Sequence, residues 1–361
     1  MELIDTLSEF LLKESSYNID QISQIESKLT EYSKCKLNRK YLLNQLEAIL
    51  LGESSPYIGK LFALESKSAV SSIFTEPLLL DKQLWIILSV VSRINVFRRQ
   101  AYFAEKKSFV ADLSIHNILT LNNKGVLILK NFLEPSLHNS IMEELNSEPY
   151  ALEKANTKNI KTNIPFISRF HFFKTRLKAS GSILKNVSKI ANNCGYTNGY
   201  WHARKLVYSS SFCQKINIKN NENDIQKDSH ADTLFPSLKF WYFPYEVSIN
   251  KSFLYAISSN KMSLNRMQIE ADKIKTISNS IRNPYTSNIS SSYKSQLEGS
   301  LRYSLAEIDQ MGLSISPVNT PSNSLVLADV SGIHSRGNGE DEGTDAMRIS
   351  IHGHTRHLKV F

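Results

Sequence analysis

The stretch SHADTLFPSLKFWYFPYEV, residues 229–247, carries the strongest signal for both fold and chemistry. It opens with a histidine and an aspartate two residues apart, His230 and Asp232, and continues into an apolar, aromatic run. On a β-strand, residues two apart point to the same face, so both side chains could bind one ion. The pair alone decides little, because 9 histidines and 34 acidic residues in 361 positions predict about one such motif by chance.

A third candidate ligand follows a second β-type run. NSLVLADVSGIHSRG (323–337) indicates a strand, then a glycine-containing turn that leads to His334. Two imidazoles and one carboxylate on one face of an octahedral iron(II) leave three positions open, enough for a bidentate 2-oxo acid and O₂. Zinc prefers closed four-coordinate sites or a bound water, so a zinc hydrolase is the weaker interpretation. The pattern predicts an iron(II) site at His230, Asp232 and His334.

An arginine begins the next strand-like run, RISIHGHTR (348–356). Strand alternation places Arg348 and Ser350 on one face and the two isoleucines of the run on the other. A planar guanidinium binds a carboxylate through two parallel hydrogen bonds. We therefore expect Arg348, with the Ser350 hydroxyl beside it, to hold the far carboxylate of 2-oxoglutarate. Three later histidines lack a nearby carboxylate and are interpreted as pocket wall or surface: His352, His354 and His357.

Beyond these motifs, the N-terminal region and the rest of the chain differ in the spacing of their apolar residues. Residues 1–115 repeat apolar residues at three- and four-residue spacing, which predicts a helical N-terminal region of unknown role. Short β-type runs separated by turn signals predict a mainly β domain of the jelly-roll, cupin-like kind over residues 116–361. Its first strand is expected at Val126–Leu129, followed by a helix after Pro135. Residues 262–312 interrupt the strands with a helical stretch and a polar tract, which predicts a lid over the site.

Composition and charge narrow the class of protein further. Three widely spaced cysteines, Cys35, Cys194 and Cys213, indicate neither a disulfide framework nor a zinc knuckle, and favour a reducing, cytoplasmic compartment. The most apolar run, residues 84–91, is far shorter than the ~20 residues that a membrane-spanning helix needs. The net charge of +9 attracts anions, but no nucleic-acid-binding motif accompanies it. We expect a polar or anionic small-molecule substrate and no nucleic acid.

Several of these segments together resemble the phytanoyl-CoA dioxygenase family. Residues 230–243 look like that family's metal-binding strand, and residues 323–356 are similar to its closing strands. Residues 125–135 resemble its opening strand, and residues 258–267 resemble the segment after its core strand. The resemblance covers about residues 118–361. It implies a double-stranded β-helix, iron(II), 2-oxoglutarate and O₂ as cofactor and cosubstrates, and usually hydroxylation of an unactivated C–H bond with release of succinate and CO₂.

The resemblance also suggests roles for individual residues. It supports the three metal ligands and the arginine named above. Trp241 sits where the family tends to place an aromatic residue near the cosubstrate, and Lys239, on the same strand face, could supply a second cation. Where members often carry Gly-Ser-His, this chain has Ser258-Ser259-Asn260, a departure that bears on substrate contacts. Related halogenases lose the carboxylate ligand, so the presence of Asp232 disfavours halogenation.

Two alternatives stay open on the sequence alone. The chain could be a catalytically silent binding or scaffold protein on an oxygenase fold, with its helical N-terminal region as the partner surface. The same site could also catalyse desaturation, ring closure or epimerisation. Two residues near His334 have double interpretations: Asp329 shapes the preceding turn or orients the imidazole, and Arg336 contacts substrate or cosubstrate or bridges to the acidic residues 340–342.

Overall fold

The structure is a computed structural model, and it describes the second part of the chain in segments. Besides a few core positions between 183 and 190, the described residues are 114–147, 167–171, 208–217, 226–232, 238–261, 263–282, 301–337 and 347–356. The predicted helical region 1–115 lies outside these segments, apart from its last two residues. Within the described segments, no helix is long and apolar enough to cross a membrane.

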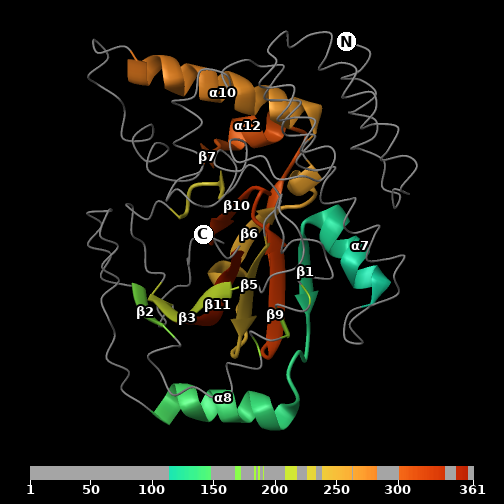
Figure 1. Cartoon of the computed structure of the whole chain (residues 1–361), viewed down its shortest axis with the longest axis vertical. Helices are drawn as coiled ribbons and strands as arrows, with labels where there is room; N and C mark the ends of the chain where they lie inside the picture. Colours follow the sequence, from blue (N-terminus) through green and yellow to red (C-terminus); the bar gives the residue numbers. More distant parts are fainter. Residues whose placement is uncertain are drawn as a thin grey trace.

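Two antiparallel sheets form the frame of the described domain (Figure 1). The six-stranded sheet contains, in spatial order, β1 (Val126–Leu129), β9 (Ser324–Asp329), β5 (Leu238–Phe243), β11 (Met347–Arg356), β3 (Tyr208–Asn217) and β2 (Ile167–His171). The five-stranded sheet contains β7 (Leu301–Arg302), β4 (His230–Ala231), β10 (His334–Arg336), β6 (Phe253–Ala256) and β8 (Ile315–Pro317). The arrangement fits the predicted cupin-like fold, and the first strand lies where the sequence predicts it.

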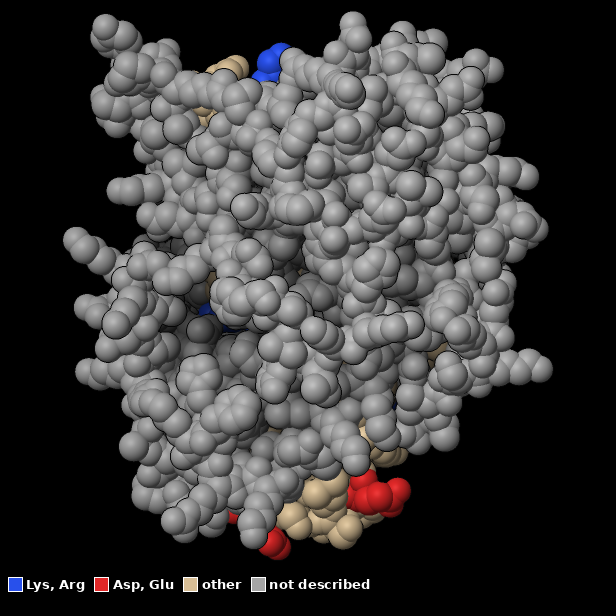
Figure 2. Space-filling model, in the orientation of Figure 1, with Lys and Arg blue, Asp and Glu red and all other residues tan. Residues whose placement is uncertain are grey.

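Helices flank the sheets at both ends. Helices α10 (Leu264–Arg282) and α12 (Leu305–Gln310) lie at one end, and α8 (Pro135–Ser147) lies at the other (Figure 1). In the same orientation, acidic side chains of the described residues are visible at the α8 end (Figure 2). The helix expected after Pro135 is therefore confirmed as α8.

Helix α7 (Ile115–Lys124) leads the chain into the first strand. Ser114 caps its N-terminus, since the hydroxyl accepts a hydrogen bond from Asn117 N at 3.2 Å. Gly125 ends the helix with φ of 77°, a conformation that costs glycine little. A Cβ at this position would lie 2.2 Å from Tyr255 Oη, so space as well as backbone requires glycine here. The turn brings α7 against β1 and against the short helix η4 (Ser259–Lys261).

The two faces of the six-stranded sheet have different surroundings. On the outer face, Leu238, Phe240 and Tyr242 of β5 pack with Ile351 of β11 in a core cluster shared with α7 and α8. The opposite face looks toward the five-stranded sheet and packs in a second cluster that includes Phe243. This alternation puts Lys239 and Trp241 on the inner face, together with Arg348 and Ser350 of the neighbouring strand.

Part of the predicted lid segment, residues 262–312, forms a helix and a short strand of the described domain. Its helical stretch is confirmed as α10, which buries Met267, Ile274 and Ile277. Near its other end, β7 pairs with β4, so these two residues are part of the five-stranded sheet. Residues 283–300 lie outside the described residues, and a lid function for the segment stays a prediction.

Candidate metal centre

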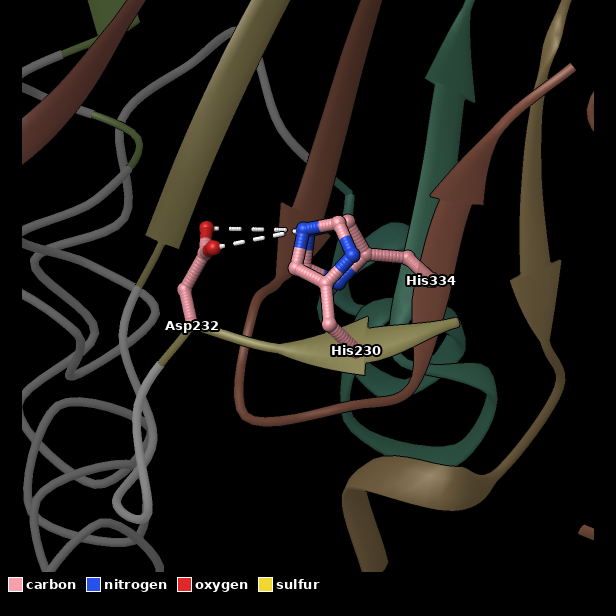
Figure 3. A group of neighbouring side chains, drawn as sticks. All are labelled: His230, Asp232 and His334. Atoms are coloured by element: carbon pink, nitrogen blue, oxygen red, sulfur yellow. Dashed lines mark ion pairs between the residues drawn. The ribbon is translucent and has the colours of Figure 1, made fainter. Parts of the chain in front are cut away.

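Three side chains converge from two neighbouring strands of the five-stranded sheet. His230 lies on β4, Asp232 follows directly after it, and His334 begins β10. His230 and His334 are direct partners in the antiparallel pairing of β4 with β10, which places their side chains on one face. One ligand atom from each of the three residues lies within 4.8 Å of the others (Figure 3). The structure thus brings together the three residues that the sequence singles out.

Each imidazole is held by a backbone carbonyl two residues earlier in the chain. His230 Nδ1 lies 2.7 Å from Asp228 O, and His334 Nδ1 lies 3.0 Å from Gly332 O. A carbonyl only accepts hydrogen bonds, so each Nδ1 carries the proton and each Nε2 presents its lone pair. These Nε2 atoms lie 3.5 Å and 3.6 Å from oxygens of the Asp232 carboxylate. Such carbonyl partners orient an imidazole for metal binding.

The protonation states also suit a metal. Burial, reinforced by the neighbouring His334, lowers the pKa of His230 to about 3. Burial by itself would raise the pKa of the Asp232 carboxyl, but Lys239 and the two histidines hold this pKa well below its usual range. At neutral pH His230 is therefore neutral and Asp232 ionised, the forms in which these groups bind metals.

Lys239 contacts the triad directly. Its Nζ donates a hydrogen bond to Asp232 Oδ2, and 15% of its side chain is exposed. The sequence suggests Lys239 as a cation for the cosubstrate or the substrate, whereas the structure pairs it with a candidate metal ligand. Two residues further along β5, Trp241 stacks on Phe253 of β6, with ring centroids 5.0 Å apart and planes at 20°. Trp241 therefore fills space between the two sheets.

Arg348 and Ser350 lie on the inner face of β11, as alternation predicts. Both are buried. Arg348 Nη1 donates a hydrogen bond to Lys251 O at 2.9 Å, which ties β11 to the segment before β6. Ser350 Oγ lies 3.5 Å from His352 Nδ1, so these two side chains contact each other on the inner face of β11. Their binding of 2-oxoglutarate stays a prediction.

Sequence reasoning missed Arg302, which lies beside the triad. It is the direct partner of His230 in the pairing of β7 with β4, so the two side chains share a face. Its Nη1 lies 3.7 Å from Asp228 Oδ2, and its charge contributes to the lowered pKa of His230. A two-residue strand at the end of a polar tract gives no periodic signal, so the sequence alone could not have assigned it.

Two other residues named in the sequence analysis have structural partners. Asp329 Oδ1 accepts hydrogen bonds from Ser331 N at 3.1 Å and from Ser331 Oγ at 2.7 Å, whereas His334 bonds elsewhere. Asp329 therefore shapes the turn. Asn260 is fully buried and donates through Nδ2 to Asn122 O of α7 at 3.0 Å. That residue, which stands where the resembled family often has histidine, connects the core to α7.

Comparison with known proteins gives no family assignment. No family model and no curated protein matches the chain. Similar solved structures include the non-heme alpha ketoglutarate dependent epimerase SnoN from nogalamycin biosynthesis, 12% identical, with a TM-score of 0.37 over 68% of this chain and 84% of that one. HygX from Streptomyces hygroscopicus, solved with nickel, 2-oxoglutarate and hygromycin B, is 11% identical, with a TM-score of 0.39 over 69% and 89%. EctD from S. alaskensis, solved with 2-oxoglutarate and 5-hydroxyectoine, is 10% identical, with a TM-score of 0.41 over 69% and 79%.

All these TM-scores lie below 0.5, so the functional conclusion rests on the strand pairing and side-chain geometry of this chain. Membership of the phytanoyl-CoA dioxygenase family stays a prediction.

Proposed function

We propose that this chain is a mononuclear non-haem iron(II)/2-oxoglutarate-dependent dioxygenase whose metal ligands are His230, Asp232 and His334. The observation that carries the proposal is their convergence within 4.8 Å, with both Nδ1 atoms bonded to carbonyls. Two imidazole nitrogens and one carboxylate oxygen form the donor set of the facial triad, which leaves positions open for a cosubstrate. A structural zinc site would need a fourth protein ligand, and no other His, Cys, Asp or Glu joins this group within the described segments.

The strand order supports the same proposal. Strands β3 to β6 and strands β8 to β11 alternate between the two sheets, while β6 and β8 pair within the five-stranded sheet and β7 is an extra edge strand. This connectivity fits a double-stranded β-helix. In this arrangement the metal strands β4 and β10 are central neighbours in the five-stranded sheet. Residues 116–361 would then be the catalytic domain, with residues 1–115 as an additional region.

Iron(II) bound at the triad would supply the chemistry, in which 2-oxoglutarate and O₂ oxidise a C–H bond and succinate and CO₂ are released. The residues of the chain would bind and orient the reactants. Lys239 holds the Asp232 carboxylate in place and keeps it ionised. Arg348, buried on the inner face of β11 beside the Ser350 hydroxyl, would grip the far carboxylate of 2-oxoglutarate. Trp241, stacked between the sheets, would help to exclude water from the reacting groups.

The charges around the triad support a polar or anionic small molecule as substrate. Two cationic side chains lie beside the candidate ligands. Lys239 forms an ion pair with Asp232, and Arg302 is opposite His230 in the pairing of β7 with β4. The whole chain adds a net charge of +9, which favours the approach of anions. Because Asp232 is retained, we propose hydroxylation of such a substrate in preference to halogenation.

Anaerobic titration of the purified protein with Fe(II) and 2-oxoglutarate tests the proposal. The expected result is the weak visible charge-transfer band of the iron chelate, lost in His334→Ala and weakened in Arg348→Ala. Lys273→Met is a suitable control, since Lys273 lies on α10 and pairs with Glu307. On admission of O₂, succinate should form from 2-oxoglutarate. If the wild-type protein binds neither iron nor 2-oxoglutarate, the enzyme proposal fails and the non-catalytic scaffold replaces it.

A further inference from the structure

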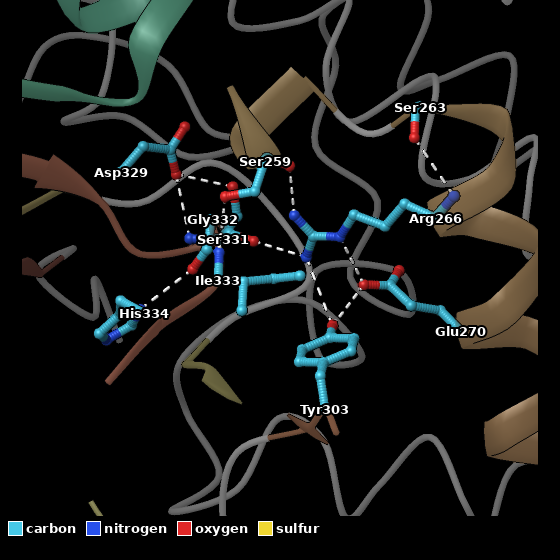
Figure 4. Close-up of polar contacts among 10 residues, drawn as sticks. All are labelled: Ser259, Ser263, Arg266, Glu270, Tyr303, Asp329, Ser331, Gly332, Ile333 and His334. Atoms are coloured by element: carbon cyan, nitrogen blue, oxygen red, sulfur yellow. Dashed lines mark hydrogen bonds and ion pairs between the residues drawn. The ribbon is translucent and has the colours of Figure 1, made fainter. Parts of the chain in front are cut away.

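A buried arginine lies behind the candidate metal centre. Arg266, in the first turn of α10, has no exposed surface, and each nitrogen of its guanidinium donates a hydrogen bond (Figure 4). Nε donates to Glu270 Oε1 at 2.8 Å, and Nη1 donates to Ser259 O. Nη2 donates to Ser331 O at 2.6 Å and lies 3.4 Å from Tyr303 Oη. A helical ion pair at this spacing is usually exposed, whereas this one is closed off from water.

One end of this network reaches the turn that presents His334. Residues 330–333 connect β9 to β10, and the carbonyl of Gly332 in this turn accepts the His334 Nδ1–H hydrogen bond at 3.0 Å. The next amide, Ile333 N, donates to Ser259 Oγ at 2.8 Å. Ser259 belongs to the short helix η4 (Ser259–Lys261), which precedes α10. The turn is thus held from the side of η4.

Arg266 joins these two segments. Its guanidinium donates to the carbonyls of Ser259 and Ser331, one on η4 and one in the turn. Both bonds are charge-assisted and buried, the conditions in which hydrogen bonds are strongest. The fork of the guanidinium also fixes the separation of the two carbonyls, which a lysine ammonium, as a point donor, would not do.

The other end of the network reaches the strand of His230. Tyr303 Oη donates to Glu270 Oε1 at 2.5 Å. The backbone N–H of Tyr303 donates to Ser229 O at 2.8 Å, directly before His230. Both strands that carry histidine ligands are therefore connected to one buried cluster, made of Arg266, Glu270 and Tyr303.

We propose that Arg266 is a positioning residue of the metal centre. It holds the turn before His334 and, through Glu270 and Tyr303, the strand of His230, and so sets the spacing and the ring orientation of the two imidazoles. The role in metal binding rests on the function proposed above, whereas the role in ordering the turn does not. The hydrogen bonds of the guanidinium named above include none to the three ligands, so its effect on His334 passes through Ser331 and Gly332.

The decisive variant is Arg266→Met combined with Glu270→Met. Together the two changes remove both buried charges at nearly constant volume, so the fold is expected to keep most of its stability. The carbonyls of Ser259 and Ser331 lose their common donor. Loss of an outer hydrogen-bond partner typically weakens metal binding about 10- to 100-fold. We therefore expect Co(II) to bind the full-length double variant about 10- to 100-fold more weakly than the wild type, measured by calorimetry and by the Co(II) absorption spectrum.

A control separates positioning from loss of stability. Ile277→Ala lies on the same helix and removes a buried side chain outside the network. It should lower the unfolding midpoint without changing Co(II) affinity. Arg266→Lys keeps the charge but loses the fork, and should weaken Co(II) binding as well. If the double variant binds Co(II) as tightly as the wild type, Arg266 has only a structural role and the proposal is overturned.

Amide hydrogen exchange on the metal-free protein gives an independent readout. The amides of Gly332 and Ile333, bonded to Asp329 O and Ser259 Oγ, should exchange faster in the double variant than in Ile277→Ala. Unchanged exchange at these amides would overturn the proposal even if metal binding were affected. If wild-type protein binds no metal, the proposed function fails, and the exchange rates alone decide whether Arg266 orders the turn.

Discussion

Replacing Lys239 with methionine should tighten metal binding. Lys239 Nζ donates a hydrogen bond to Asp232 Oδ2, an oxygen of the carboxylate that a metal ion at the triad would use. A +1 and a +2 charge about 5 Å apart repel by about 1.7 kcal/mol even at the dielectric constant of bulk water, which is about 15-fold in a dissociation constant. The site is mostly buried, so this figure is a lower bound. Methionine keeps the volume of the side chain and removes only its charge.

Calorimetric titration with Co(II) or Ni(II), without 2-oxoglutarate, measures this effect. Lys273→Met is a closely matched control. Both lysines are 15% exposed and both pair with a carboxylate, but the partner of Lys273 is Glu307 of α12. The two variants lose the same net charge, so a difference between them reports the position of the charge. We expect Lys239→Met to bind at least about 15-fold more tightly than wild type, and Lys273→Met to match wild type within about twofold.

The opposite result would refute the electrostatic argument. If Lys239→Met binds the metal more weakly than Lys273→Met, the lysine acts mainly by orienting the Asp232 carboxylate, and its charge matters less than its hydrogen bond. A second titration, with 2-oxoglutarate added to the metal-loaded variants, tests the role suggested from sequence. Weaker binding of 2-oxoglutarate to Lys239→Met alone would show that Lys239 also contacts the cosubstrate.

Three further predictions concern the structure around the site. In Gly332→Ala the new Cβ would lie 1.9 Å from Tyr255 Oη, so urea unfolding should show a loss of about 1–3 kcal/mol, and Co(II) titration should show weaker binding. Arg266→Met alone leaves the Glu270 charge buried and should cost about 3–5 kcal/mol in urea unfolding, most of which the double variant with Glu270→Met should recover. Burial would raise the pKa of the Glu307 carboxyl, but Lys273 and the capping hydrogen bonds with Ser304 lower this pKa below its usual value. The stabilisation that Glu307 contributes is therefore present above the unfolded-state pKa and is lost as pH falls through the folded-state pKa. Unfolding free energies of Glu307→Gln should therefore depend less on pH below about 4.5 than those of wild type.

The parts of the site that could be predicted are those that follow from strand periodicity. His230 and Asp232 are two residues apart in sequence, and this spacing puts both beside one position in space. His334 lies after a strand-and-turn pattern, and Arg348 and Ser350 share the inner face of their strand because alternation is a property of any strand. Strand alternation predicts these side-chain positions correctly because each sheet turns one face of every strand inward.

The parts that escaped prediction depend on non-local contacts. Arg266 and Glu270 are four residues apart on a helix, a pattern that ordinarily indicates an exposed ion pair. They are buried because the turn before His334 packs against the start of α10, and no periodicity in the chain encodes that approach. The hydrogen bond between Lys239 and Asp232 was unpredictable for the same reason, since it depends on the distance between the two sheets and not on either segment alone.

The charges around the triad divide into two groups with different consequences. Arg266 and Glu270 form a pair without net charge, and they act on the shape of the site through hydrogen bonds to backbone carbonyls. Lys239 and Arg302 are cations that lie beside the ligands, and they change the electrostatic potential at the site. The charge of Arg302, for example, contributes to the lowered pKa of His230. A metal must bind against these cations, whereas an anionic cosubstrate or substrate is attracted by them. Metal and 2-oxoglutarate should therefore bind cooperatively, because the negative charge of 2-oxoglutarate offsets the repulsion between the metal ion and these cations. As a result, 2-oxoglutarate should tighten Co(II) binding more in the wild type than in Lys239→Met. Equal tightening in both proteins would show that this cation contributes nothing to the coupling.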